Sequence, residues 1–300
     1  MNKIPVGKTI AETYRFTFVH LERVIGVIWL PVVLLTVGEY FVSGNYLSGM
    51  ANAMDSGDFA SQGPLLARLF GFELVSLALM AMIGVAITRE ILQPLQRPLF
   101  LRFGLGGTEL RVIGAFAGLY VLMIVFAVLL VLAGMLLGFL LNAVIPATMG
   151  MAAGTKRAVG FGFLLAVCLS PLLIYALMRL SFFVVPAATY QGGFGIEKSW
   201  QAAKGNVWRI ILVSLAVGLP LALLYVGIEA AILGPDSLNP HIELMGDKAA
   251  QARHSAEQLR LLAANLPVLM GVKFLLAPFL YGLLFGAPAF AWRALGGQRQ

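Results

Sequence analysis

Charged residues are scarce in this chain of 300 residues. Asp, Glu, Lys and Arg together make up 12% of it, whereas hydrophobic residues make up 60%. A soluble domain carries about 25% charged residues and about half apolar ones. Folding in water leaves much of any chain exposed, so a soluble globule has no place for this much apolar surface. The composition therefore excludes a soluble enzyme, a disordered chain and an ordinary nucleic-acid-binding domain, and it requires a lipid bilayer.

Cysteine and histidine, which carry much metal and covalent chemistry, are nearly absent. Cys168 is the single cysteine, which excludes an internal disulfide and a thiolate metal cluster. It lies in an apolar run, where we expect it to act as a small core hydrophobe. The histidines are His20, His241 and His254, and His241 with Glu243 lacks the spacing of metal ligands. We therefore expect solvated histidines, no metal and no cofactor.

Motifs for enzymatic catalysis are missing as well. The run Gly104-Leu105-Gly106-Gly107 follows no predicted strand, so we interpret it as a turn and not as a phosphate-binding loop. No serine lies in a nucleophile elbow, and no pair of carboxylates has a recognisable acid–base spacing. Catalysis would need a site assembled across several helices. The chain is therefore predicted to be non-enzymatic.

Long apolar runs dominate the sequence instead, and its mean hydropathy is +0.89. A helix needs about 20 apolar residues to cross about 30 Å of hydrocarbon. The third qualifying run has 30 residues, so as one helix it must tilt, bend or project from the membrane. The predicted fold is all-α, a single integral membrane domain over residues 1–300 with about six transmembrane helices. These six spans are residues 24–41, 69–87, 112–141, 161–178, 207–233 and 267–291.

The segments between the spans differ in composition. Residues 43–64 are rich in Gly, Ser, Asn and Asp and lack periodicity, which predicts an irregular loop. Residues 247–264 are rich in Ala, Gln, Glu, Arg and Leu, which predicts a polar surface helix leading into the last span. The first apolar run is too long for a typical signal peptide, so we expect it to be a permanent anchor.

Positive charge predicts the orientation of the chain. With the N-terminus inside, 14 of the 21 Lys and Arg residues fall in cytoplasmic segments, and six fall outside. Lys and Arg collect on the cytoplasmic side of membrane proteins, which also accounts for the net charge of +7. We therefore expect a multi-pass protein of the bacterial cytoplasmic (inner) membrane with both termini in the cytoplasm.

An amphipathic leader precedes two of the spans. In residues 8–21 the apolar stripe is Ile10, Tyr14, Phe18 and Leu21, and residues 196–204 carry a shorter stripe. Each leader is predicted to lie on the cytoplasmic interface as a helix. Each leader also runs into a span that contains a Leu-Pro step and, later, a glutamate. This shared pattern is either a parallel internal repeat or an arrangement common in membrane proteins.

The most distinctive motifs lie in residues 179–213. A span ends in Arg179-Leu180-Ser181 and Pro186, and a short helix follows with Ser199-Trp200 and Gly205-Asn206 before Trp208-Arg209 opens the next span. This stretch resembles the bacterial membrane proteins grouped as the glycerophosphodiester phosphodiesterase membrane-domain family. The Leu30-Pro31 step and the ending Ala291-Trp292-Arg293-Ala294-Leu295 are similar too.

The resemblance covers most of the chain in architecture and about 35 residues in motif. It implies a six-span helical membrane protein. It does not imply hydrolysis, because the phosphodiesterase barrel of such proteins needs some 250 residues and a metal site of His and carboxylates, and no such segment is present.

Ionisable residues inside spans are costly and often functional. Lys273 is the clearest example, and it either snorkels to the outer interface or joins a buried charge cluster. Glu39, Glu73 and Glu229 lie in the outer parts of their spans, and Glu229 is our first choice of partner because consecutive helices are usually neighbours. Such a cluster is either structural or lines a cavity open to the outside.

A second cluster is predicted at the inner interface. Trp favours the headgroup layer, and each basic residue near the surface adds about 1 kcal/mol of attraction to anionic lipid. The cluster serves either as plain anchoring or as contacts to a lipid headgroup. Its members are Lys198, Trp200, Lys204, Trp208 and Arg209.

These patterns predict a non-enzymatic membrane protein that interacts with membrane lipids, with a membrane protein partner or with itself, and not with nucleic acid. The alternative function is a transporter or permeability protein for a small polar or lipid-like solute. That alternative requires Lys273 and an acidic partner to face a water-filled cavity.

Overall fold

The fold is a bundle of helices in a computed structural model that describes residues 3–59, 62–93, 106–144, 154–191, 193–234 and 248–296. Every regular element within these ranges is a helix, which confirms the all-α prediction. The helices are α1 (Val6–Val19), α2 (Leu21–Ser56), α3 (Gly63–Leu92), α4 (Gly107–Val144), α5 (Gly154–Ser181), α6 (Val184–Tyr190), α7 (Ile196–Ala202), α8 (Val207–Leu233) and α9 (Lys248–Ala294).

Six stretches in the described residues are long and apolar enough to cross a membrane, in agreement with the sequence prediction. They lie in α2, α3, α4, the α5–α6 segment, α8 and α9. The 38 residues of α4 form one helix of about 57 Å, and the 47 residues of α9 would reach about 70 Å if straight. Both exceed the hydrocarbon layer of about 30 Å, so these helices must tilt, bend or project beyond it.

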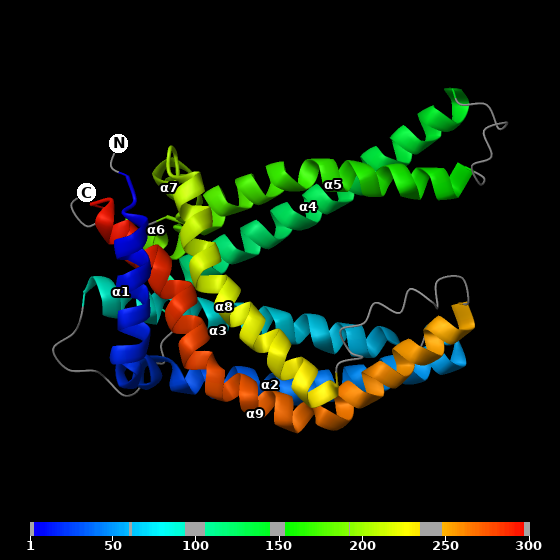
Figure 1. The fold of residues 1–300 in the computed structure, drawn as a ribbon, viewed down its shortest axis with the longest axis horizontal. Helices are drawn as coiled ribbons and strands as arrows, with labels where there is room; N and C mark the ends of the chain where they lie inside the picture. Colours follow the sequence, from blue (N-terminus) through cyan, green and yellow to red (C-terminus); the bar gives the residue numbers. More distant parts are fainter. Residues whose placement is uncertain are drawn as a thin grey trace.

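The helices form two diverging arms that meet at one end of the molecule (Figure 1). One arm is the α4–α5 hairpin, and the other contains α2, α3, α8 and α9. The short helices α1, α6 and α7 lie at the junction of the arms, where both chain ends also lie (Figure 1). We call this region the junction end.

The tightly packed core lies at the junction end. Phe183 at the start of α6 is fully buried and its ring contacts Trp292 of α9, which is 3% exposed. Farther out, the apolar side chains of α4 are open, and Phe139 is 71% exposed. Cys168 is exposed too, so the prediction of a core cysteine is wrong. Lipid takes the place of protein packing around such residues, because a helix in a bilayer needs no apolar protein partner.

Helix α1 packs against α9 with a face of threonines. Thr9, Thr13 and Thr17 are buried, and the close approach depends on Gly282 and Gly286. A Cβ on Gly282 would lie 2.9 Å from Cγ2 of Thr17, so only glycine fits there without a shift. The apolar stripe predicted for this segment lies beside the contact, with Ile10 and Tyr14 half-buried and Phe18 54% exposed.

The irregular loop predicted over residues 43–64 is wrong over residues 43–56, because α2 continues to Ser56. Asn45 and Ser48 donate side-chain hydrogen bonds to the carbonyls of Phe41 and Gly44, one helical turn earlier. Polar side chains of this kind can bond to carbonyls of their own helix, so a segment with the composition of a loop can still be helical. By contrast, the helix predicted over residues 247–264 is confirmed from Lys248 onward.

Candidate functional site

Lys273 lies in a membrane-spanning part of α9 and forms an ion pair with Glu39 of α2. Its Nζ atom is 2.5 Å from each carboxylate oxygen, and the two side chains are 32% and 27% exposed. Within lipid, an unpaired charge of either sign costs several kcal/mol, so pairing stabilises both. The structure therefore supports the charge-cluster interpretation of Lys273 over snorkelling.

The partner that we expected first, Glu229, is not the one found. Helices α2 and α9 pack antiparallel along much of their length, and this register places Glu39 opposite Lys273. Glu229 is half-buried on α8, and Glu73 of α3 is exposed. Neither forms an ion pair with another described residue. The expectation failed because helices that are close along the chain need not have matching charges at the same depth.

Two further ion pairs connect α9 to the first two helices. Arg293 pairs with Glu12 of α1 at 3.0 Å, and Arg260 pairs with Asp55 at the far end of α2. The acids Glu12, Glu39 and Asp55 follow one another along the chain in the reverse order of their basic partners on α9. Reverse order is the pattern of an antiparallel helix pair, and it is the signal that could have identified Glu39 from sequence.

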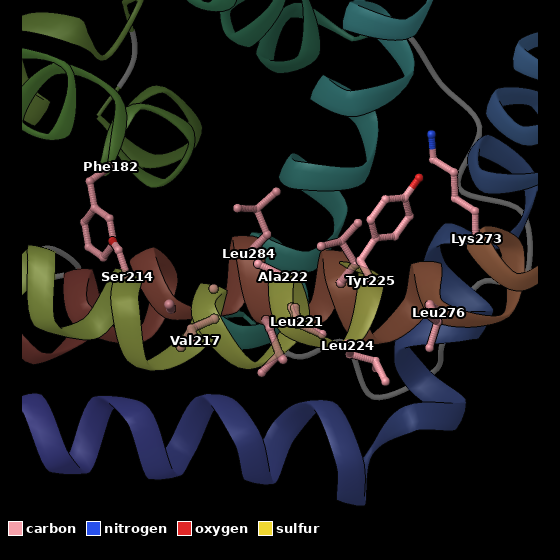
Figure 2. Close-up of a pocket in the computed structure, with 14 residues that line it drawn as sticks. Phe182, Ser214, Val217, Leu221, Ala222, Leu224, Tyr225, Lys273, Leu276 and Leu284 are labelled. Carbon is pink, nitrogen blue, oxygen red and sulfur yellow. The ribbon is translucent and has the colours of Figure 1, made fainter. Parts of the chain in front are cut away.

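An apolar groove of about 400 Å³ runs between α8 and α9 and begins beside this ion pair. Lys273 and Tyr225 lie at one end with their polar tips on the same side, and Phe182 and Ser214 lie at the other end (Figure 2). The groove is lined by Phe182, Ser214, Val217, Gly218, Leu221, Ala222, Leu224, Tyr225, Lys273, Leu276, Leu280, Leu283, Leu284 and Ala287.

The groove is open on one side and almost wholly hydrocarbon in character. Leu224 and Leu284 of its lining are 47% and 49% exposed, and its polar groups are one amine and two hydroxyls. From Lys273 to Ala287 it follows about 21 Å of α9. That length is enough for an acyl chain, since one leaflet of a bilayer contributes about 15 Å of hydrocarbon. The site can bind a chain-like apolar ligand whose polar end lies beside Lys273.

The inner-interface cluster predicted from sequence does not form one site. Trp200 lies under the guanidinium of Arg179, 3.7 Å from the ring centroid, and its carbonyl accepts a hydrogen bond from Arg179. The adjacent Ser199 is fully buried, donates to the carbonyl of Arg179 and accepts from the N–H of Phe183. This part of the motif therefore holds α7 against the α5–α6 corner.

Arg209 also has a structural partner. It donates to the carbonyl of Ile4 at 2.7 Å, while Oδ1 of Asn206 accepts a hydrogen bond from the N–H of Ile4. The two side chains thus hold the N-terminal segment against the start of α8. Trp208 is 78% exposed and Lys204 is exposed, so these two are free to contact headgroups.

Lys198 lies apart from the other four, at a second cavity of about 550 Å³ at the junction end. Its amine donates to the carbonyl of Gln191 at 2.7 Å. The other residues that line this cavity are Tyr190, Gln191, Gln201, Ala202 and Trp292.

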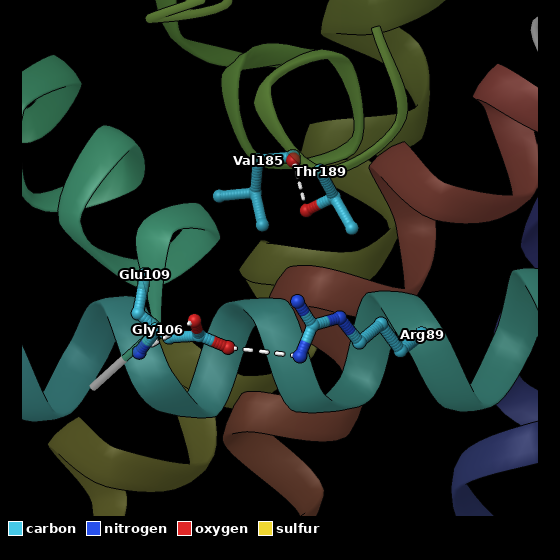
Figure 3. Close-up of polar contacts among 5 residues, drawn as sticks. All are labelled: Arg89, Gly106, Glu109, Val185 and Thr189. Carbon is cyan, nitrogen blue, oxygen red and sulfur yellow. Dashed lines mark hydrogen bonds and ion pairs between the residues drawn. The ribbon is translucent and has the colours of Figure 1, made fainter. Parts of the chain in front are cut away.

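Sequence reasoning missed the ion pair of Arg89 on α3 with Glu109 in the first turn of α4, at 2.9 Å (Figure 3). Glu109 is buried and also accepts the N–H of Gly106, so it fixes the start of the α4–α5 arm. The guanidinium extends toward the carboxylate of Glu109, while the hydroxyl of Thr189 on α6 donates to the carbonyl of Val185 (Figure 3). A carboxylate in the first turn of a helix is a recognised stabilising signal, and it was present in the sequence.

The described residues contain no group of three or more His, Cys, Asp or Glu side chains that could hold a metal ion. His241, Glu243, Gly104 and Leu105 lie outside the described residues. No protein-family model matches the chain, and neither does any curated protein or solved structure. The resemblance to the membrane-domain family therefore stays a prediction that rests on its motifs.

Proposed function

We propose that this protein is a non-enzymatic, lipid-binding protein of the bacterial inner membrane. A single observation supports this most directly: an apolar groove, open to the side, ends at a charged pair within the membrane-spanning part of the bundle. An acyl chain fits the hydrocarbon walls, and a polar headgroup has Lys273 and Tyr225 as its nearest polar partners. Each CH₂ group transferred from water would contribute about 0.8 kcal/mol, but a lipid already in the bilayer gains mainly from close packing and headgroup contacts.

The alternative of a transporter for a polar solute has less support. A path for such a solute needs polar groups along its length, whereas this groove carries leucine, valine and alanine between its two ends. A lipid-like solute that moves along the groove remains compatible with the same geometry. Retention of lipid by the purified protein is therefore the first property to measure.

Filling the groove tests the proposal. Gly218 lines the groove, and a Cβ built on it meets nothing within 4 Å, so Gly218→Leu adds a side chain to open space. Gly227→Leu is the matched control, because Gly227 also has open space and lies on the opposite face of α8, outside the groove lining.

Native mass spectrometry of the purified variants reads out bound lipid. We expect wild type and Gly227→Leu to retain a lipid that Gly218→Leu loses by at least about tenfold, which corresponds to about 1.4 kcal/mol of binding free energy. Equal lipid retention by all three proteins would refute a site in the groove.

A further inference from the structure

The cavity at Lys198 is a second, chemically different site. It lies at the junction end between α6, α7 and the last turns of α9, and its described lining contains lysine, tyrosine, tryptophan and two glutamines. No carboxylate belongs to this lining. The site is thus rich in hydrogen-bond donors and positive in charge, the opposite of the hydrocarbon groove.

Two of the lining residues carry a buried donor that has no partner among the described residues. These donors are the indole N–H of Trp292 and the hydroxyl of Tyr190, and both are shielded from solvent. The Trp292 side chain as a whole is only 3% exposed. Buried polar groups in proteins nearly always have a partner, so two unpartnered donors on one cavity point to an absent acceptor. An indole N–H can only donate, which excludes a ligand group that offers donors alone.

Lys198 brings one positive charge to the same cavity. The Lys198 ammonium has three N–H donors and uses one on Gln191, so two are left for a ligand. Glu197, the nearest acid in sequence, lies outside the lining and accepts a hydrogen bond from the amide of the lining residue Gln201.

We infer that this cavity binds a phosphate group, through Lys198, Tyr190 and Trp292. Phosphate offers several strong acceptor oxygens with negative charge, which matches one cation and two neutral donors without an acid. A phosphate of this kind belongs either to a phospholipid whose headgroup reaches the junction end or to free inorganic phosphate. The site goes beyond the proposed groove function, because it uses different residues and a different ligand chemistry.

Thermal unfolding in detergent separates the two sources. The first arm adds inorganic phosphate, with chloride at matched ionic strength as the reference. The second arm adds phosphatidylglycerol, with an uncharged glycolipid of the same chain length as the reference. A ligand that binds only the folded state stabilises it by RT ln(1 + [L]/Kd), so the unfolding temperature rises with ligand concentration. A specific rise with inorganic phosphate indicates free anion, and a rise with phosphatidylglycerol alone indicates lipid.

The variants are Lys198→Met, which removes the cation, and Tyr190→Phe, which removes only the hydroxyl. We expect Lys198→Met to weaken phosphate binding by at least about tenfold and Tyr190→Phe by about fivefold, by loss of a charge-assisted and a neutral hydrogen bond respectively. Lys8→Met is the control, since Lys8 is an exposed lysine of α1 outside the cavity.

The Tyr190→Phe variant also tests whether a lost ligand response is caused by misfolding. Without ligand it removes a buried unpartnered hydroxyl, so this variant should fold at least as stably as wild type. A response to either probe that is lost in both cavity variants and kept in Lys8→Met and Gly227→Leu supports the site. No response in wild type, or equal responses in all variants, overturns it.

Discussion

The Lys273–Glu39 pair shows how single residues adapt a lipid-spanning bundle to carry charge. Each side chain is about one-third exposed, and each has the other as its ion-pair partner. An exposed ion pair contributes little to stability, whereas removing one partner of a fully buried pair is strongly destabilising. A half-buried pair in lipid lies between these two cases. We therefore attribute to it an intermediate stabilisation and a role in shaping the polar end of the groove.

A charge-reversal cycle tests this pair. Lys273→Glu and Glu39→Lys should each lower the free energy of unfolding in detergent by about 2 kcal/mol, because each leaves two like charges together. The double variant should regain most of that loss, since it restores opposite charges. Urea or thermal unfolding measures all four proteins. Additive losses in the double variant would show that the two side chains do not interact.

At the same scale, the sequence identified Lys273 and the three candidate acids but not the correct pair. Burial and register decide which acid faces the lysine, and neither is encoded in the local sequence around residue 273. The motif residues Ser199, Trp200 and Arg209 could be found from sequence, but their partners could not. Ser199 and Arg209 bond to backbone atoms, whereas Trp200 contacts the guanidinium of Arg179. Backbone partners leave no signal in the sequence, so residues with a structural role were predicted to be headgroup contacts.

Among the elements, α9 organises the fold. It is the longest helix in the described residues, and it contacts α1, α2, α3, α6 and α8. Pro267, Pro278 and Pro288 lie inside it, and each removes a backbone hydrogen bond. Gly282 and Gly286 remove side chains where α1 crosses. The prolines thus allow α9 to bend, and the glycines allow α1 to pack closely against it.

Two glycine-to-alanine changes on α9 should have opposite effects on stability. Gly282→Ala should destabilise the protein by about 1–2 kcal/mol, because the added methyl meets the stiff, buried Thr17 side chain at 2.9 Å. Gly271→Ala on the same helix has open space, so it should stabilise by about 0.5–1 kcal/mol through helix propensity. Unfolding in detergent measures both. Equal effects of the two changes would contradict the tight crossing.

The six spans were predictable because apolar runs of about 20 residues have few other outcomes. The continuation of α2 to Ser56 was not predictable from composition. Ala51 and Ala53 are buried in this extension, and Asp55 pairs with Arg260 across the gap between helices. Those contacts are long-range, so they stabilise a helix that local composition does not favour.

The whole molecule has one polar, tightly packed end and two apolar arms (Figure 1). Both chain ends, α6 and α7 lie at the junction end, together with Lys198, Lys204 and Arg209. The excess of basic residues there supports a cytoplasmic junction end. In that orientation the phosphate cavity faces the inner leaflet, and the far ends of α2 and α9 face outward.

Labelling of single cysteines tests this orientation. In a Cys168→Ser background, Asn52→Cys should react with a membrane-impermeant maleimide in intact cells, because Asn52 is exposed on the far half of α2. Lys204→Cys at the junction end should react only after the membrane is opened. The reverse pattern would place both termini outside.

The central claim is that an acyl chain occupies the α8–α9 groove. It is tested most directly with a phospholipid that carries a photoactivatable diazirine in its acyl chain, followed by mapping of the crosslinked residues by mass spectrometry. We predict crosslinks concentrated on Leu221, Leu276 and Leu280, and lost in Gly218→Leu. Crosslinks spread over the exposed apolar face of α4 in proportion to exposure, with none in the groove, would contradict it.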